Sequence, residues 1–84
     1  MQRNMTKEEK FDEIYRIYEN EVFKISRYYT NDEYTAQDIT QKAFYKLFQH
    51  FDNVNLDSVR AYLLRTARNL SFNWLRDMKH EQGD

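Results

Sequence analysis

The chain has 84 residues, close to the lower limit for independent folding, so we expect one domain with one modest core. It contains one glycine and neither proline nor cysteine, which favours long helices and excludes disulfide bonds and thiolate metal ligands. The net charge of −1 argues against a uniformly basic nucleic-acid coat, yet Asp57 to His80 holds five Lys or Arg against two Asp or Glu.

The start of the sequence has no feature of a secretory signal. The first ten residues, MQRNMTKEEK, are charged and lack an apolar stretch. No window of the chain approaches eighteen consecutive apolar residues. We therefore expect a cytoplasmic protein without membrane insertion.

A first helix is predicted at residues 6–29, because apolar side chains recur there every three or four residues. Thr6 and Glu9 have the spacing of a capping box, in which each side chain accepts a hydrogen bond from the other residue's backbone N–H. The recurring apolar residues are Phe11, Ile14, Tyr15, Tyr18, Val22, Ile25 and Tyr29.

Two more helices are predicted, at residues 32–50 and 57–78, with an irregular segment at 51–56 between them and a frayed tail at 81–84. Residues 30–33, TNDE, supply N-cap candidates for the second helix, and Asn55 or Asp57 would cap the third. Each helix has one apolar face, which it can bury only against the other two. The predicted fold is all-α, a small three-helix bundle over residues 1–84, with a short extra turn as the alternative.

The third predicted helix has two unlike sides at about 100° per residue. The apolar side would face the core and consists of Val59, Leu63, Thr66, Leu70 and Trp74, with Tyr62 and Ala67 at its margins. The opposite side carries Arg65, Arg68, Asn69, Phe72 and Arg76, with Lys79 beside them. Guanidinium groups suit phosphates, amides bond base edges and an exposed aromatic ring stacks on bases. Such a side is typical either of a DNA-binding surface or of ordinary solvation. Under ordinary solvation, Phe72 could be buried against the first helix or against a second protein.

The sequence gives little support to catalysis. His50 and His80 are isolated, and there is no glycine-rich phosphate loop, so we expect no catalytic residue, no metal site and no cofactor. The main alternative to a DNA-binding module is a helical bundle that binds only other proteins. A helix-turn-helix regulator fits less well, because the predicted basic side runs along the whole last helix rather than only its N-terminus.

Two motifs resemble region two of extracytoplasmic-function sigma factors. Residues 36–44, AQDITQKAF, are similar to the family signature AEDLVQEVF. Residues 59–76, VRAYLLRTARNLSFNWLR, are similar to VRAWLYRIARNLALDWLR. Tyr62 replaces the usual Trp and keeps an aromatic ring, whereas Asn73 replaces an Asp and removes a charge beside Trp74. Both motifs occur in the family's order, and the resemblance covers residues 11–76.

The resemblance implies that the protein acts in transcription initiation. The second helix would bind the clamp helices in the largest subunit of core RNA polymerase. The matching positions are Asp38, Gln41, Lys42 and Tyr45. An anti-sigma factor is a further expected partner, since covering this surface or the basic side would block function. The family's minus-thirty-five-binding domain is not in this sequence, and we expect the chain to be a fragment of a longer sigma factor.

The resemblance also implies that the protein melts promoter DNA by capturing a flipped non-template base of the minus-ten element. The segment before the third helix would hold this base, with Phe51, Asn53 and Asn55 as candidates. An Asn in a turn often serves the backbone instead, and Phe51 could be the last core residue of the second helix. The third helix would hold the duplex edge and the non-template strand, with Arg60, Arg65, Arg68, Asn69, Phe72 and Arg76 as the DNA-binding residues.

Overall fold

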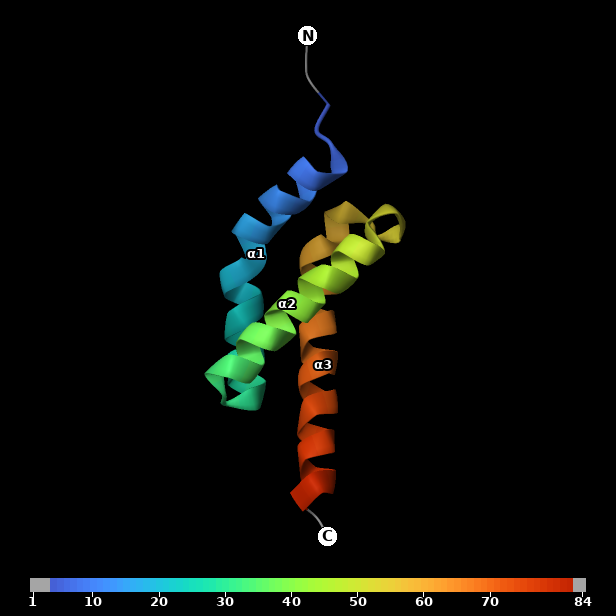
Figure 1. The fold of residues 1–84 in the computed structure, drawn as a ribbon. Helices are drawn as coiled ribbons and strands as arrows, with labels where there is room; N and C mark the ends of the chain where they lie inside the picture. The colour runs from blue at the N-terminus through green and yellow to red at the C-terminus, as the bar shows by residue number, and fades with distance from the viewer. Residues whose placement is uncertain (1–3, 83–84) are drawn as a thin grey trace.

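The computed structural model of the protein describes residues 4–82, and side chains as far as residue 80. It has three helices: α1 (Lys7–Thr30), α2 (Glu33–Gln49) and α3 (Val59–Gln82) (Figure 1). Two short 3₁₀ turns, η1 (Phe51–Asn53) and η2 (Leu56–Ser58), link α2 to α3. The prediction of a small all-α bundle of three helices is confirmed. Figure 1 shows α2 crossing α3 on its way back from the end of α1.

Local side chains set the first two helix starts. The Thr6 hydroxyl accepts a hydrogen bond from the Glu9 N–H at 3.1 Å, and the Glu9 carboxylate accepts one from the Thr6 N–H at 3.0 Å. This is the predicted capping box. At the end of α1, Asn31 adopts φ = 53°, the left-handed conformation that turns the chain toward α2. The Asp32 carboxylate then caps α2 by accepting from the Thr35 hydroxyl and N–H, which lowers the pKa of Asp32.

The core lies where the three helices meet. Phe11 of α1 contacts the rings of Phe44, Phe48 and Phe51 at one end, with centroid separations of 6.2, 5.2 and 6.5 Å. These edge-on contacts are the favoured geometry of aromatic pairs. The central cluster of buried residues consists of Val22, Ile39, Ala43, Phe44, Leu47, Phe51, Val59, Leu63 and Ala67.

Four hydroxyl side chains are also buried at the helix contacts. Each donates to the carbonyl of its own helix four residues earlier, so none lacks a partner. They are Ser26, Thr30, Thr40 and Ser71. Ser71, with its hydroxyl 2.8 Å from the Ala67 carbonyl, is fully buried although the sequence did not place it in the core. Small side chains at these positions leave room for the neighbouring helices to approach closely.

The structure differs from the sequence predictions in two segments. Residues 51–56, predicted to be irregular, lie within or beside the two 3₁₀ turns, and Phe51 is buried at the start of the first turn. Helix α3 continues to Gln82, past the predicted end at Met78 and into the predicted frayed tail, of which residues 83–84 lie outside the described part. No glycine or proline occurs in α3 before Gly83, and Lys79 and His80 in its last turn suit the helix dipole.

Candidate functional site

The outward face of α2 carries the residues expected to bind polymerase. Asp38, Gln41, Lys42 and Tyr45 are all exposed, and their spacing places them within an arc of roughly 100° on the helix. The Lys42 ammonium lies 2.9 Å from the Asp38 carboxylate, so the two charges neutralise each other. Tyr45 is 62% exposed. We call these four residues the α2 face, a mixed surface without net charge.

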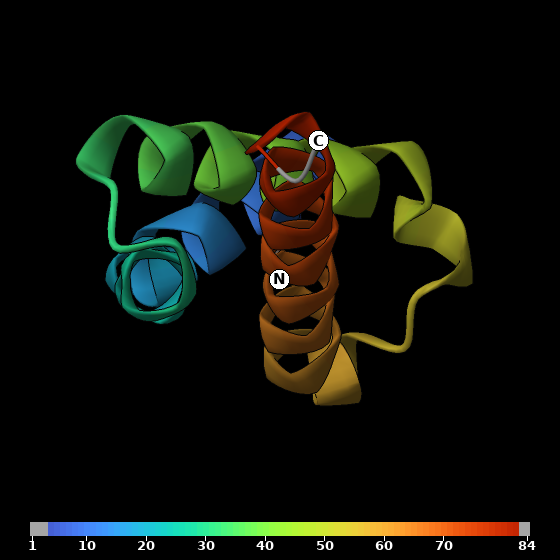
Figure 2. The same ribbon diagram turned by 90° about the horizontal axis from the view of Figure 1, so that it is seen from below.

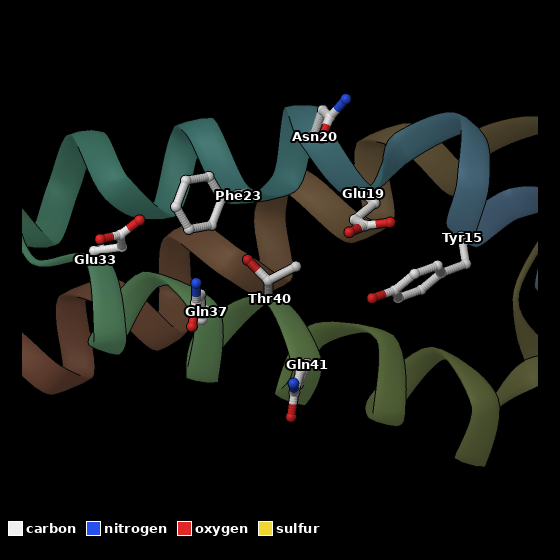
Figure 3. Close-up of a pocket in the computed structure, with 8 residues that line it drawn as sticks. All are labelled: Tyr15, Glu19, Asn20, Phe23, Glu33, Gln37, Thr40 and Gln41. Atoms are coloured by element: carbon white, nitrogen blue, oxygen red, sulfur yellow. The ribbon is translucent and has the colours of Figure 1, made fainter.

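A hollow of about 390 Å³ lies beside this face, between α1 and α2 (Figure 3). Figure 3 shows Phe23 and Glu19 of α1 directed toward α2, with Tyr15 closing one end and Glu33 the other. Its lining also includes Asn20, Gln37, Thr40 and Gln41, and no Lys or Arg. The sequence alone does not reveal this hollow, because Glu19 and Glu33 look like ordinary surface charges until α1 and α2 are placed together.

The outward face of α3 holds exposed cationic and amide groups along much of its length. Arg65, Arg68, Asn69 and Arg76 are exposed on the side opposite the buried Leu63. We call these four exposed residues the basic face. Arg76 has an adjacent carboxylate, with its Nε 3.6 Å from Asp77. The charge of Arg65 and Arg68 is not balanced by an ion pair within the described residues.

Phe72 is neither fully free nor fully buried. Its ring is 42% exposed and meets the ring of Tyr29, at the end of α1, edge-on at 5.0 Å. The guanidinium of Arg68 lies over the Phe72 ring at 5.2 Å, a cation–π contact. Phe72 thus packs against the first helix, one of the two alternatives that the sequence left open, and also supports Arg68.

Arg60, which was also predicted to contact DNA, does not share the basic face. It lies about 140° from Arg65 around the helix, on the side of α1. Its Nε donates to both Glu21 carboxylate oxygens at 3.0 and 3.1 Å, and its Nη2 donates to one of them. The hydrogen bonds raise the pKa of Arg60 and lower that of Glu21. Arg60 therefore joins α3 to α1.

The segment between α2 and α3 forms a second hollow, of about 360 Å³, at the start of the basic face. We call it the loop hollow. Its lining consists of Asn53, Val54, Asn55, Ser58, Ala61, Tyr62 and Arg65. Asn53 and Asn55 line it as expected, and Asn55 also serves the backbone by accepting from the Asp57 N–H at 3.0 Å. Phe51 is absent from the lining, because its ring is buried against Phe11 in the core.

Residues 4–82 offer neither a membrane-spanning helix nor a cluster of metal ligands. No helix in this range is long and apolar enough to cross a membrane. The same residues contain no group of three or more His, Cys, Asp or Glu placed to hold a metal ion.

Comparison with known proteins gives the family. The Sigma-70 region 2 family model matches residues 14–81. The chain is 31% identical over 70 residues to the ECF RNA polymerase sigma factor SigM of Bacillus subtilis (strain 168). This alignment covers 83% of the chain and 43% of that protein, so the chain spans less than half of its relative. No solved structure matches significantly. The chain belongs to the sigma-70 region 2 family.

Proposed function

We propose that this domain joins core RNA polymerase to promoter DNA and captures an unpaired non-template base of the minus-ten element. The observation that carries the proposal is the loop hollow, which opens at the start of the basic face and is lined by amide and aromatic side chains. The hollow lies at the lower end of the volume range usual for small-ligand sites. The proposed function needs no catalytic group in this chain, since the polymerase performs the chemistry.

Capture of a flipped base has a defined cost. Taking a base out of the duplex costs a few kcal/mol of lost stacking and pairing. The Tyr62 ring and the amides of Asn53 and Asn55 in the loop hollow can offset this cost by packing and hydrogen bonding. Arg65, which lines the hollow and belongs to the basic face, would place a positive charge beside the phosphate of the captured nucleotide. Binding energy given only to the unpaired state would shift the equilibrium toward melted DNA.

The basic face would hold the strand that leads into the hollow. Arginine and asparagine side chains bind phosphates and sugars without regard to base sequence, which fixes the position of the strand. If each of the three arginines of the face neutralises one phosphate of single-stranded DNA, log affinity should fall with log salt at a slope of about −2. Arg60 would contribute through the position of α3 rather than through DNA, because Glu21 binds it.

The α2 face would bind the clamp helices of the largest polymerase subunit. Tyr45 offers a large exposed ring, and Asp38 and Gln41 offer acceptors for arginine side chains of the partner. An anti-sigma partner that covered the α2 face or the basic face would block the function by occlusion.

The test of base capture uses nine-nucleotide single-stranded DNAs with A, C, G or T at the centre, a fifth with an abasic centre, and thymidine elsewhere. We expect the 84-residue chain to bind one of the four probes with a central base roughly tenfold more tightly than it binds the abasic probe. Fluorescence anisotropy at low salt measures both affinities. Asn53→Ala should remove most of that preference. It should leave binding of the abasic probe within about twofold, because the basic face is unchanged.

The controls separate capture from general attraction. Asp52→Ala, at the exposed neighbouring position outside the hollow's lining, should keep the base preference. If all five probes bind equally well, base capture by the loop hollow is excluded. If the chain binds neither DNA nor core polymerase, the alternative of a bundle that binds only other proteins replaces the proposed function.

A further inference from the structure

The aromatic contacts of Phe72 continue onto the end of α1. Tyr29 meets Phe72 at 5.0 Å with an interplanar angle of 72°, and Tyr28 meets Tyr29 at 5.3 Å and 76°. Three rings therefore run edge to face from α3 to α1, and the Arg68 guanidinium lies over the Phe72 end. We call Tyr28, Tyr29 and Phe72 the aromatic row.

The three rings differ in how much surface they offer. Tyr29 is half-buried between its two neighbours, and Phe72 is already in contact with Arg68 and Tyr29. Tyr28 is 80% exposed, so most of its ring is open to a ligand. An exposed ring loses little side-chain freedom when its neighbour already restricts it, which favours its use as a contact surface.

The aromatic row lies across α3 from the loop hollow. Figures 1 and 2 show the end of α1 on one side of α3 and the segment between α2 and α3 on the other. The basic face lies on α3 between them. Phe72 follows Arg65, which lines the hollow, by seven positions. This corresponds to about 10 Å along the helix axis. At about 3.4 Å per nucleotide, a stacked strand needs more than four nucleotides to start in the hollow, cross the basic face and reach Tyr28.

The charges around Tyr28 suit nucleic acid. Arg27 precedes it and is exposed, with its guanidinium held by the Asn31 side-chain oxygen at 2.8 Å. Arg68 stands at the other end of the row. The nearby Asp32 carboxylate is engaged in the cap of α2, where it accepts from Thr35. A phosphate at the Tyr28 end of the row would have the Arg27 guanidinium nearby, and one at the Phe72 end would have that of Arg68.

We propose that Tyr28 is a stacking platform for an unpaired base of the same DNA strand whose flipped base occupies the loop hollow. This inference rests on the proposed function. Every base has a π-face, so the platform accepts any base and contributes affinity and strand direction rather than sequence preference. Tyr29 and Phe72 act as positioning residues, which hold Tyr28 relative to the basic face.

The experiment measures binding of the full 84-residue chain to fluorescent oligothymidylates of four and twelve nucleotides. Tyr28→Ala should weaken binding of the longer probe roughly tenfold and leave the four-nucleotide probe, too short to span both sites, within about twofold. Tyr28→Phe should bind like wild type, because stacking needs the ring and not the hydroxyl. The slope of log affinity against log salt should not change with Tyr28→Ala, because the tyrosine carries no charge.

The matched control is Tyr34→Ala, since Tyr34 is 82% exposed on α2 and lies outside the aromatic row. It should bind both probes like wild type. Thermal melting of each variant, followed by circular dichroism, checks that the bundle is folded. Removal of such an exposed ring should leave the melting midpoint nearly unchanged.

Each contrary result has a separate meaning. Equal binding of both probes by Tyr28→Ala and wild type overturns the platform but leaves the proposed function standing. An equal loss with Tyr28→Phe and Tyr28→Ala overturns stacking in favour of a hydrogen bond from the hydroxyl. If the double variant Arg65→Glu/Arg68→Glu also binds DNA like wild type, the proposed function itself fails.

Discussion

The α2 face and the basic face are both exposed helix surfaces of one small bundle, but their charges are arranged differently. On the α2 face, Asp38 and Lys42 neutralise each other at 2.9 Å, and Tyr45 stands beside them. On the basic face, Arg65 and Arg68 carry charges that no carboxylate balances among the described residues. The two surfaces therefore suit partners of different chemistry.

This difference predicts two modes of binding. A neutral, partly aromatic surface binds through shape, hydrogen bonds and burial of rings, which depend weakly on salt. A face of unbalanced arginines binds a polyanion through counterion release, which depends strongly on salt. Substitutions can therefore disrupt both surfaces together, or affect one surface and spare the other.

The largest effect is expected from Leu63→Ala, because Leu63 is fully buried in the core that holds both surfaces in place. Loss of a buried leucine should lower the free energy of unfolding by about 2–5 kcal/mol, through lost burial and the cavity left behind. Urea denaturation measures this loss. DNA and polymerase affinities should both fall as the unfolded fraction rises. Leu75→Ala, at a 39% exposed position of the same helix, is the control and should cost under about 1 kcal/mol.

The next largest effect concerns the basic face alone. Arg65→Glu/Arg68→Glu should weaken single-stranded DNA binding roughly a hundredfold at low salt and flatten its salt dependence, because two phosphate contacts become repulsive. Polymerase binding should stay within about twofold. The control Lys10→Glu/Arg16→Glu makes the same change of net charge on α1. A comparable loss of DNA affinity in this control would show that total charge matters, rather than the basic face.

A smaller effect is expected on the α2 face. Tyr45→Ala should weaken binding to core polymerase roughly tenfold at both low and moderate salt, as is usual for an exposed aromatic anchor. DNA binding should not change. Tyr28→Ala should show the opposite pattern. If both tyrosine variants lose polymerase and DNA together, the two surfaces are not independent.

The sequence predicted the features that depend on local contacts or on helical period. The Thr6–Glu9 capping box involves residues three apart, and the exposed side of α3 follows from about 100° per residue. The sequence did not predict the burial of Ser71, because a serine is ordinarily expected at the surface. Its hydroxyl can be buried here because it donates to a carbonyl of its own helix. The Glu21–Arg60 pair joins residues 39 positions apart, and only the packing of α1 on α3 brings them together. The Tyr28–Tyr29–Phe72 row was missed for the same reason.

The smallest effect is expected from the Glu21–Arg60 pair, which fixes the start of α3 relative to α1 but belongs to neither surface. Hydrogen bonding to Arg60 lowers the pKa of Glu21 below its ordinary value of 4.5. The pair should therefore stabilise the fold above pH 4.5, and this contribution is lost as the pH falls through the lowered pKa in the folded state. The melting midpoint of Glu21→Gln should be below that of wild type by a few degrees or less at pH 7, since the pair is partly exposed. The difference should shrink as the pH falls through the lowered pKa of Glu21. A difference that does not shrink as the pH is lowered would mean that the substituted amide disturbs packing rather than charge.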